Sequence, residues 1–135
     1  VQAAGSSPLV LGQAVDHPET IATAMRIGRP ARCEQALQTA EESNGRIIAA
    51  TDEQILDMQR LLASNGVWVE PASAAGLAGL ALEIQAGHID VRGKRIVAVC
   101  TGHGLKDPDV IVSRFRAPQV LPAELHALED ALLKG

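Results

Sequence analysis

The sequence predicts an α/β fold in which helices cover a parallel sheet, and three observations support this class. Short β-branched runs alternate along the chain with longer helical patterns, which is the order that a parallel sheet requires. The 135 residues suffice for about one domain, and 47% of them are apolar. Aromatic side chains make up only 1%, so the core must consist of small and aliphatic residues, which suits helices packed on a sheet.

The first 45 residues are expected to contain two helices after an initial strand end. Residues 2–12 predict a strand that runs into a loop. A capping-box pattern predicts a helix over 16–27. Apolar residues at helical spacing predict a second helix, which begins near Cys33 and ends at Asn44–Gly45.

The middle of the chain predicts two strands and two helices. Residues 46–50, RIIAA, form a strand pattern, and Thr51 then begins a third helix with a second capping box. A short strand follows over 67–69. Ser73 is expected to cap a helix of small residues over 74–86.

The last third of the chain contains the clearest strand pattern, the β-branched run over 95–100. A loop of two glycines around a histidine follows it directly, Thr101-Gly102-His103-Gly104. Residues 107–109 predict a turn, and 110–119 predict an irregular segment that could hold a short strand. Pro122 is expected to open a final helix with four leucines on one face.

Composition argues against several classes of partner. The net charge is −4 and the basic residues are scattered, so no stripe for nucleic acid is predicted. No apolar run approaches the roughly 20 residues that a bilayer span requires, and a membrane partner is not expected. Cys33 and Cys100 predict reduced thiols in a cytoplasmic protein. The histidines lack metal-ligand spacing, so no metal site is predicted.

The loop after the strand at 95–100 is the first candidate site. Ligands of open α/β sheets bind at the carboxyl ends of strands, and Thr101 places a hydroxyl there. Gly102 and Gly104, on either side of His103, allow the backbone to come close to another group. The alternative is a tight turn whose hydroxyl is satisfied locally.

Glu70 and Arg26 are further candidates. Glu70 also follows a strand, so a parallel sheet would bring it to the same edge as Thr101. Its alternative role is a simple rim carboxylate beside the cap of the next helix. Arg26 could bind an anionic group, or it could be a solvated surface charge.

Four stretches carry a resemblance to a known family: ETIATAMRIGRP, ATDEQIL, VEPASAAGLAGL and VCTGHGLKDPD. They resemble successive blocks in the carboxyl-terminal part of the bacterial threonine synthase family. That family belongs to the fold-type II, or tryptophan-synthase-like, pyridoxal-phosphate enzymes. The resemblance covers residues 1–109, and 110–135 form a divergent tail with a terminal helix. It implies that residues 1–135 are part of the large domain of such an enzyme.

The resemblance implies a reaction and a set of roles. O-phospho-L-homoserine and water would give L-threonine and phosphate with pyridoxal 5'-phosphate as cofactor. Thr101 would hydrogen-bond the pyridine nitrogen, with Gly102, His103 and Gly104 along the ring edge. Glu70 would lie near the cofactor, and the segment that holds Arg26 would border the site. The resemblance also implies a homodimer.

The family's amino-terminal blocks have no counterpart in this sequence. None of the three lysines, Lys94, Lys106 and Lys134, stands in the serine-x-lysine context of the Schiff-base lysine. Val1 also opens within a strand-like pattern. The chain is therefore expected to be a piece that is inactive without the amino-terminal half of its enzyme. Two alternatives stay open: a fragment of a serine/threonine dehydratase, and a non-catalytic small-ligand-binding domain derived from such an enzyme.

Overall fold

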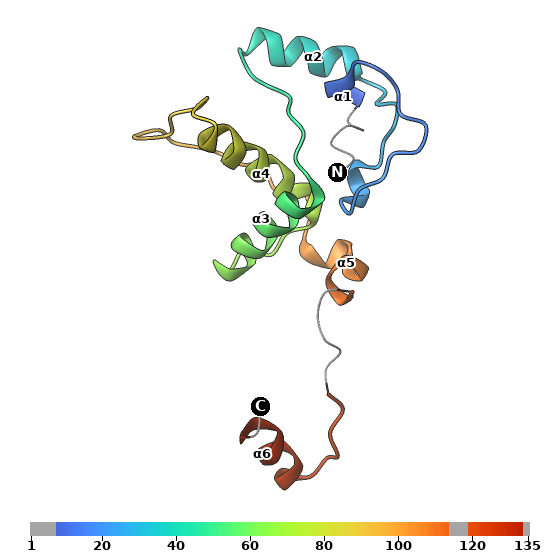
Figure 1. Cartoon of the computed structure of the whole chain (residues 1–135), viewed down its shortest axis with the longest axis vertical. Coiled ribbons are helices and arrows are strands. Elements are labelled where there is room, and N and C mark those ends of the chain that lie inside the picture. Colours follow the sequence, from blue (N-terminus) through green and yellow to red (C-terminus); the bar gives the residue numbers. More distant parts are fainter. Residues whose placement is uncertain (1–7, 114–118, 134–135) are drawn as a thin grey trace.

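The computed structural model of the chain describes residues 8–113 and 119–133, and the regular structure within these ranges is helical (Figure 1). Six α-helices and two 3₁₀ helices, η2 and η3, follow one another in these ranges: α1 (Pro8–Leu11), η2 (Thr23–Met25), α2 (Cys33–Glu42), α3 (Asp52–Ser64), α4 (Pro71–Gln85), η3 (Gly104–Lys106), α5 (Pro108–Val112) and α6 (Leu125–Leu133).

Helices α3 and α4 form the centre of the structure (Figure 1). Their buried cluster consists of Ile55 from α3, Ala74 and Ala78 from α4, and Val69 from the segment between them. The buried Gln59 amide on α3 donates to the carbonyl of Val69 at 2.7 Å. This bond fixes the segment that leads into α4, because a buried carbonyl needs a partner.

Local signals predicted α2 and α3 well. The Thr51 hydroxyl accepts from the Gln54 N–H at 3.2 Å, and the Gln54 side chain accepts from the Thr51 N–H at 2.8 Å. The predicted capping box is therefore confirmed. Helix α2 also ends where the sequence predicted, because Asn44 adopts a positive φ of 51° just beyond it.

The predicted helix over 16–27 is wrong. Only η2 is helical in this segment. The Thr20 hydroxyl donates to one carboxylate oxygen of Asp52 at 2.6 Å, and the Ile21 N–H donates to the other at 3.2 Å. These polar groups bind the first turn of α3, more than thirty residues away, in place of making bonds along a helix of their own.

The predicted parallel sheet is not formed in the part of the chain that the structure describes. Residues 46–50 and 95–100 run without regular structure, and neither makes ladder bonds with a neighbouring strand. A strand needs an adjacent backbone for its N–H and C=O groups. The pairing present in the described ranges is one isolated antiparallel bridge, between Val69 and His103.

Much apolar surface remains open. Val97 and Val99 are 82% and 79% exposed, although a strand pattern of this kind is typical of a buried position. The chain exposes 10,063 Å² in total. A compact monomer of its mass would expose roughly 6,700 Å². The chain thus exposes apolar surface that would be buried in a compact domain of this size.

The tail differs from the prediction in two respects. Helix α5 occupies Pro108–Val112, where a turn and an irregular segment were expected. The terminal helix is present as α6, but it begins at Leu125 and not at Pro122, and it lies apart from α3 and α4 (Figure 1). Near the other end, Pro8–Leu11 is helical and not a strand-to-loop transition. The strand predicted before it lies outside the described residues.

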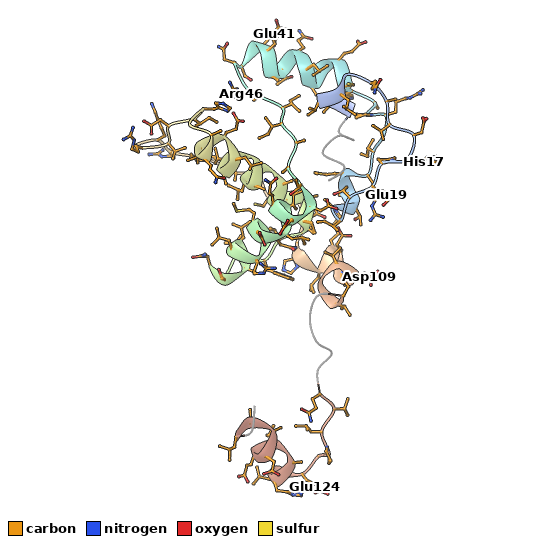
Figure 2. All side chains as sticks on the ribbon, viewed as in Figure 1. His17, Glu19, Glu41, Arg46, Asp109 and Glu124 are labelled. Atoms are coloured by element: carbon orange, nitrogen blue, oxygen red, sulfur yellow. The ribbon has the colours of Figure 1, made fainter. Side chains whose placement is uncertain are left out.

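The ionisable residues labelled in Figure 2 are all exposed: His17, Glu19, Glu41, Arg46, Asp109 and Glu124. Within the described ranges, no helix combines the length and the apolar character needed to cross a membrane. Cys33 and Cys100 are both free thiols.

Candidate functional site

The structure brings the Thr101 loop and Glu70 together. The Glu70 N–H donates to the Gly102 carbonyl at 3.0 Å, and the Gly104 N–H donates to the Trp68 carbonyl at 3.3 Å. The two segments therefore lie side by side, as the sequence predicted. They run antiparallel and not parallel, because the chain returns past α4 and approaches Val69 from the opposite direction.

Gly102 and Gly104 are required by close packing. A Cβ on Gly102 would overlap the carboxylate of Glu70, and a Cβ on Gly104 would overlap the indole ring of Trp68. The two glycines thus allow the loop to lie directly on Glu70 and Trp68. This close approach is to the protein's own side chains.

Glu70 is a buried carboxylate with one cationic partner in the described residues. Its side chain is 1% exposed, and Lys106 Nζ lies 3.0 Å from Oε2 and 3.3 Å from Oε1. Only the contact with Oε1 has hydrogen-bond geometry, and Oε2 has no hydrogen-bond partner within the described structure. Glu70 is also the N-cap residue of α4, where the helix dipole favours a negative charge.

Thr101 is exposed, and its hydroxyl has one hydrogen-bond partner within the described ranges. That partner is Ser73 Oγ on the first turn of α4, at 3.4 Å. Thr101 follows an extended segment, residues 96–99, that lines a cleft of about 320 Å³. The cleft is formed by this segment and the face of α4: Ser73, Gly76, Leu77, Leu80, Ile96, Val97, Ala98 and Val99.

Ser73 does not cap α4, and this prediction is wrong. Glu70 occupies the N-cap position and Pro71 follows it as the first helical residue. Ser73 is instead buried against the loop, where its hydroxyl accepts from the N–H groups of Thr101 and Gly102, both at 3.0 Å. A hydroxyl two residues after a Glu-Pro helix start is the sequence signal that could have indicated this role.

His103 stays at the surface of the loop. Its Nδ1 accepts from the Leu105 N–H at 3.2 Å and so caps η3. This bond orders the turn that carries Lys106 back toward Glu70. Within the described ranges, no three His, Cys, Asp or Glu side chains are arranged to hold a metal ion.

Arg26 lies outside this cluster but is tethered near it. Its Nε donates to the Thr20 carbonyl at 2.7 Å and lies 3.8 Å from the Glu19 carboxylate. The Thr23 hydroxyl in η2 donates to the Asp107 carboxylate at 2.5 Å. This bond spans 84 positions in sequence and connects the segment that holds Arg26 to the end of the loop.

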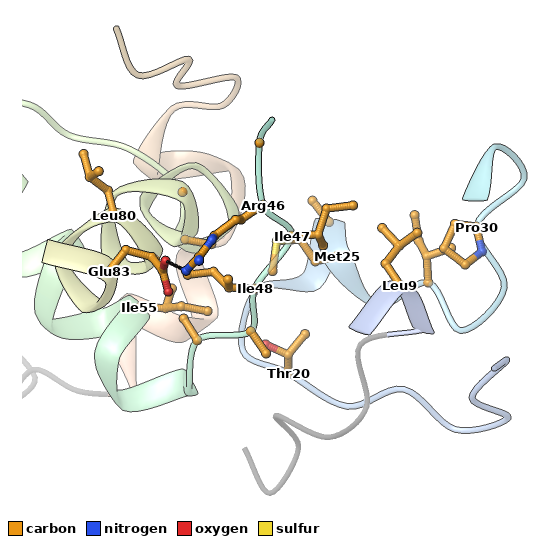
Figure 3. A pocket seen from close by; sticks show the side chains of 18 of the residues that line it. Leu9, Thr20, Met25, Pro30, Arg46, Ile47, Ile48, Ile55, Leu80 and Glu83 are labelled. Carbon is orange, nitrogen blue, oxygen red and sulfur yellow. Dashed lines mark hydrogen bonds and ion pairs between the residues drawn. The ribbon is translucent and has the colours of Figure 1, made fainter. Parts of the chain in front are cut away.

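A larger apolar groove of about 960 Å³ lies between residues 46–50, the segment around η2, and α4 (Figure 3). Arg46 Nη1 and Glu83 Oε2 are 2.5 Å apart at its edge. This hydrogen bond holds the pKa of Glu83 below its ordinary value. Neither Thr101 nor Glu70 lines the groove, so its size does not identify it with the candidate site.

Comparison with known proteins identifies the family. The sequence model for pyridoxal-phosphate dependent enzymes matches residues 1–102, and the chain belongs to this family. The threonine synthase of Mycobacterium leprae is 48% identical over 132 residues, which are 97% of this chain and 36% of that protein.

Two more distant relatives carry the same name. The threonine synthase of Halalkalibacterium halodurans is 46% identical over 99% of this chain and 38% of its own length. That of Methanocaldococcus jannaschii is 43% identical over 98% of this chain and 35% of its own length. The chain thus spans about a third of the length of the curated relatives it matches.

One group among the residues present, the Thr101 hydroxyl, is suited to contact the family's cofactor. Thr101 is exposed, and its hydroxyl, which has Ser73 as its one partner within the described ranges, has unused hydrogen-bonding capacity. The nearby carboxylate of Glu70 is already paired with Lys106. The group available to a heterocyclic nitrogen is therefore a neutral hydroxyl, which donates one hydrogen bond without supplying a full negative charge.

Proposed function

We propose that this chain is the carboxyl-terminal part of the large domain of a pyridoxal-phosphate-dependent threonine synthase. The complete enzyme would convert O-phospho-L-homoserine and water to L-threonine and phosphate. The single observation that carries the proposal is that Thr101, on the TGHG loop, is exposed and its hydroxyl has one hydrogen-bond partner within the described ranges. The identity of 43–48% to three threonine synthases over nearly the whole chain supports the choice of reaction.

Thr101 would donate its hydroxyl proton to the pyridine nitrogen of the cofactor. Pyridoxal phosphate supplies an electron sink for carbon–hydrogen and carbon–oxygen bond breaking. A neutral hydroxyl carries no negative charge that would stabilise a protonated nitrogen, as a carboxylate would. The cofactor ring would then withdraw electrons only moderately, which suits elimination and replacement better than transamination.

The remaining loop residues would shape the wall on which the ring edge rests. Gly102 and Gly104 keep the loop close to Glu70 and Trp68, so the backbone beside the cofactor is fixed. Glu70 would lie near the cofactor as a buried anchor for the loop, since its side chain is 1% exposed and forms an ion pair with Lys106. His103 would maintain the turn through its bond to the Leu105 N–H.

The rest of the enzyme would complete the site. The Schiff-base lysine and the loop that binds the cofactor phosphate would come from the amino-terminal half, which is the partner of this chain. The open extended segments at 46–50 and 95–100 would become strands of a parallel sheet against that half. We also propose that the assembled enzyme is a cytoplasmic homodimer.

Arg26 would contribute to binding of the substrate phosphate. Its guanidinium is half exposed and uses only Nε in hydrogen bonding within the described structure. The terminal nitrogens can therefore take an anion in a bidentate contact. The bond between Thr23 and Asp107 would keep Arg26 at a constant distance from the cofactor loop.

A chimera tests the proposal directly. The segment of Mycobacterium leprae threonine synthase that matches this chain is replaced by the chain itself. The purified protein, with pyridoxal phosphate, is assayed for phosphate release from O-phospho-L-homoserine and for threonine by chromatography. We expect both products in equal amounts. A folded, cofactor-loaded chimera that forms neither product would overturn the proposal.

The same preparation separates the alternatives. Ammonia released from threonine, without phosphate release from O-phospho-L-homoserine, would indicate a serine/threonine dehydratase. Binding of small ligands by the unaccompanied chain, together with a cooperative melt, would favour a stand-alone binding domain. The large exposed apolar surface of the chain argues against that second outcome.

A further inference from the structure

Ser73 connects the first turn of α4 to the loop. The residue is only 6% exposed. Its hydroxyl oxygen lies 3.0 Å from the Thr101 nitrogen and 3.0 Å from the Gly102 nitrogen. It also lies 3.4 Å from the Thr101 hydroxyl and 3.4 Å from the Gly102 carbonyl oxygen.

The capacity of a hydroxyl decides how these four contacts can be made. A serine hydroxyl has two lone pairs and one proton. The two backbone N–H groups are donors only, so they occupy both lone pairs of Ser73. Its proton is then left for the Thr101 hydroxyl oxygen or the Gly102 carbonyl. Ser73 has no lone pair left to accept the hydroxyl proton of Thr101.

The proton of Thr101 must therefore find an acceptor elsewhere. Within the described ranges Thr101 Oγ1 has no hydrogen-bond partner other than Ser73. Because Thr101 is exposed, that acceptor lies outside the described structure, as water or as a bound molecule. When Ser73 donates to Thr101 Oγ1, the chain of hydrogen bonds also makes Thr101 a better donor.

We propose that Ser73 is a positioning residue that leaves the Thr101 hydroxyl proton free and directs it to the nitrogen of the bound heterocycle. This inference rests on the proposed function, since it needs that nitrogen to face Thr101. Ser73 acts in two ways. It anchors the backbone at Thr101 and Gly102, and it prevents the Thr101 proton from being used inside the protein.

The test measures the ring nitrogen itself. The chimera is loaded with pyridoxal phosphate labelled with ¹⁵N, and the ¹⁵N chemical shift is recorded for the unmodified protein and four variants. The Thr101→Val variant gives the ¹⁵N chemical shift of a ring nitrogen that receives no hydrogen bond from the hydroxyl. Ser73→Ala is expected to move the signal part of the way toward that position. Ser73→Ala in the Thr101→Val background should cause no further movement.

Cofactor affinity gives a second readout. We expect Ser73→Ala to weaken binding of pyridoxal phosphate about tenfold, equivalent to about 1.4 kcal/mol. Ser64→Ala is the matched control, since it removes a serine hydroxyl whose bonds stay within its own helix end: it donates to the Leu61 carbonyl and accepts from the Asn65 side chain. Neither the chemical shift nor the affinity should change in that control.

The outcomes separate the inference from the proposed function. The inference on Ser73 is overturned if Thr101→Val moves the nitrogen signal and Ser73→Ala leaves it in place. If Thr101→Val leaves it in place as well, the contact between Thr101 and the nitrogen is refuted, and the inference fails with it. Should Ser73→Ala not fold, Ser73→Cys replaces it, because a thiol has similar shape and bonds weakly. An unmoved signal in Ser73→Cys would also overturn the inference.

Discussion

Substitution of Gly102 by alanine tests the packing of the loop on Glu70. The three atoms nearest to a Cβ at this position all belong to the Glu70 side chain, with Oε2 at 2.8 Å and Oε1 and Cδ closer still. Ordinary contacts between heavy atoms lie near about 3.5 Å. The carboxylate must therefore move by about 1 Å, although it is buried and paired with Lys106. Overpacking of this kind costs about 1–3 kcal/mol.

The cost is measured by urea unfolding of the chimera, followed by circular dichroism. We expect Gly102→Ala to lower the free energy of unfolding by about 1–3 kcal/mol. A double-mutant cycle isolates the cause: in a Glu70→Ala background the three nearest atoms are absent, so the same substitution should cost less than about 0.5 kcal/mol. An equal cost in both backgrounds would refute the overlap with Glu70.

Two further predictions concern the helices around the site. Thr51→Ala removes the capping box of α3 and should lower the free energy of unfolding by about 1 kcal/mol in the same urea assay. Arg46→Met removes the hydrogen bond that lowers the pKa of Glu83, so that pKa should rise in an NMR titration. Because the folded-state pKa is lowered, the stabilisation from Arg46 is present above the unfolded-state pKa and is lost as the pH falls through the folded value.

Both of these predictions have clear contradicting results. An unchanged unfolding midpoint in Thr51→Ala would mean that the capping bonds do not stabilise α3. An unchanged pKa of Glu83 in Arg46→Met would mean that the ion pair is absent in solution. A difference in stability between wild type and Arg46→Met that persists in strong acid would contradict the stated direction of the pH dependence.

Signals that act over a few residues could be predicted from the sequence. The capping box at Thr51 and the end of α2 at Asn44 depend only on neighbouring residues, and both are present. The proximity of Glu70 and the Thr101 loop also followed from the strand-like patterns that precede them. The antiparallel direction of the two segments could not be predicted, because no local sequence signal specifies the path of the chain beyond α4.

Contacts between distant segments could not be predicted. The helix expected over 16–27 does not form, and Thr20 instead makes a hydrogen bond to Asp52, which is 32 positions away. The role of Ser73 depends on the loop 28 positions later. The ion pair of Lys106 with Glu70 likewise spans 36 positions. In each case a polar side chain satisfies a tertiary partner whose position the local sequence does not encode.

The group that faces the cofactor's ring nitrogen is identified most directly by a crystal structure of the cofactor-loaded chimera. We predict Thr101 Oγ1 at about 2.6–3.2 Å from the pyridine nitrogen, with Ser73 Oγ behind it. A carboxylate in that position, or a Thr101 hydroxyl more than about 4 Å away, would contradict the account.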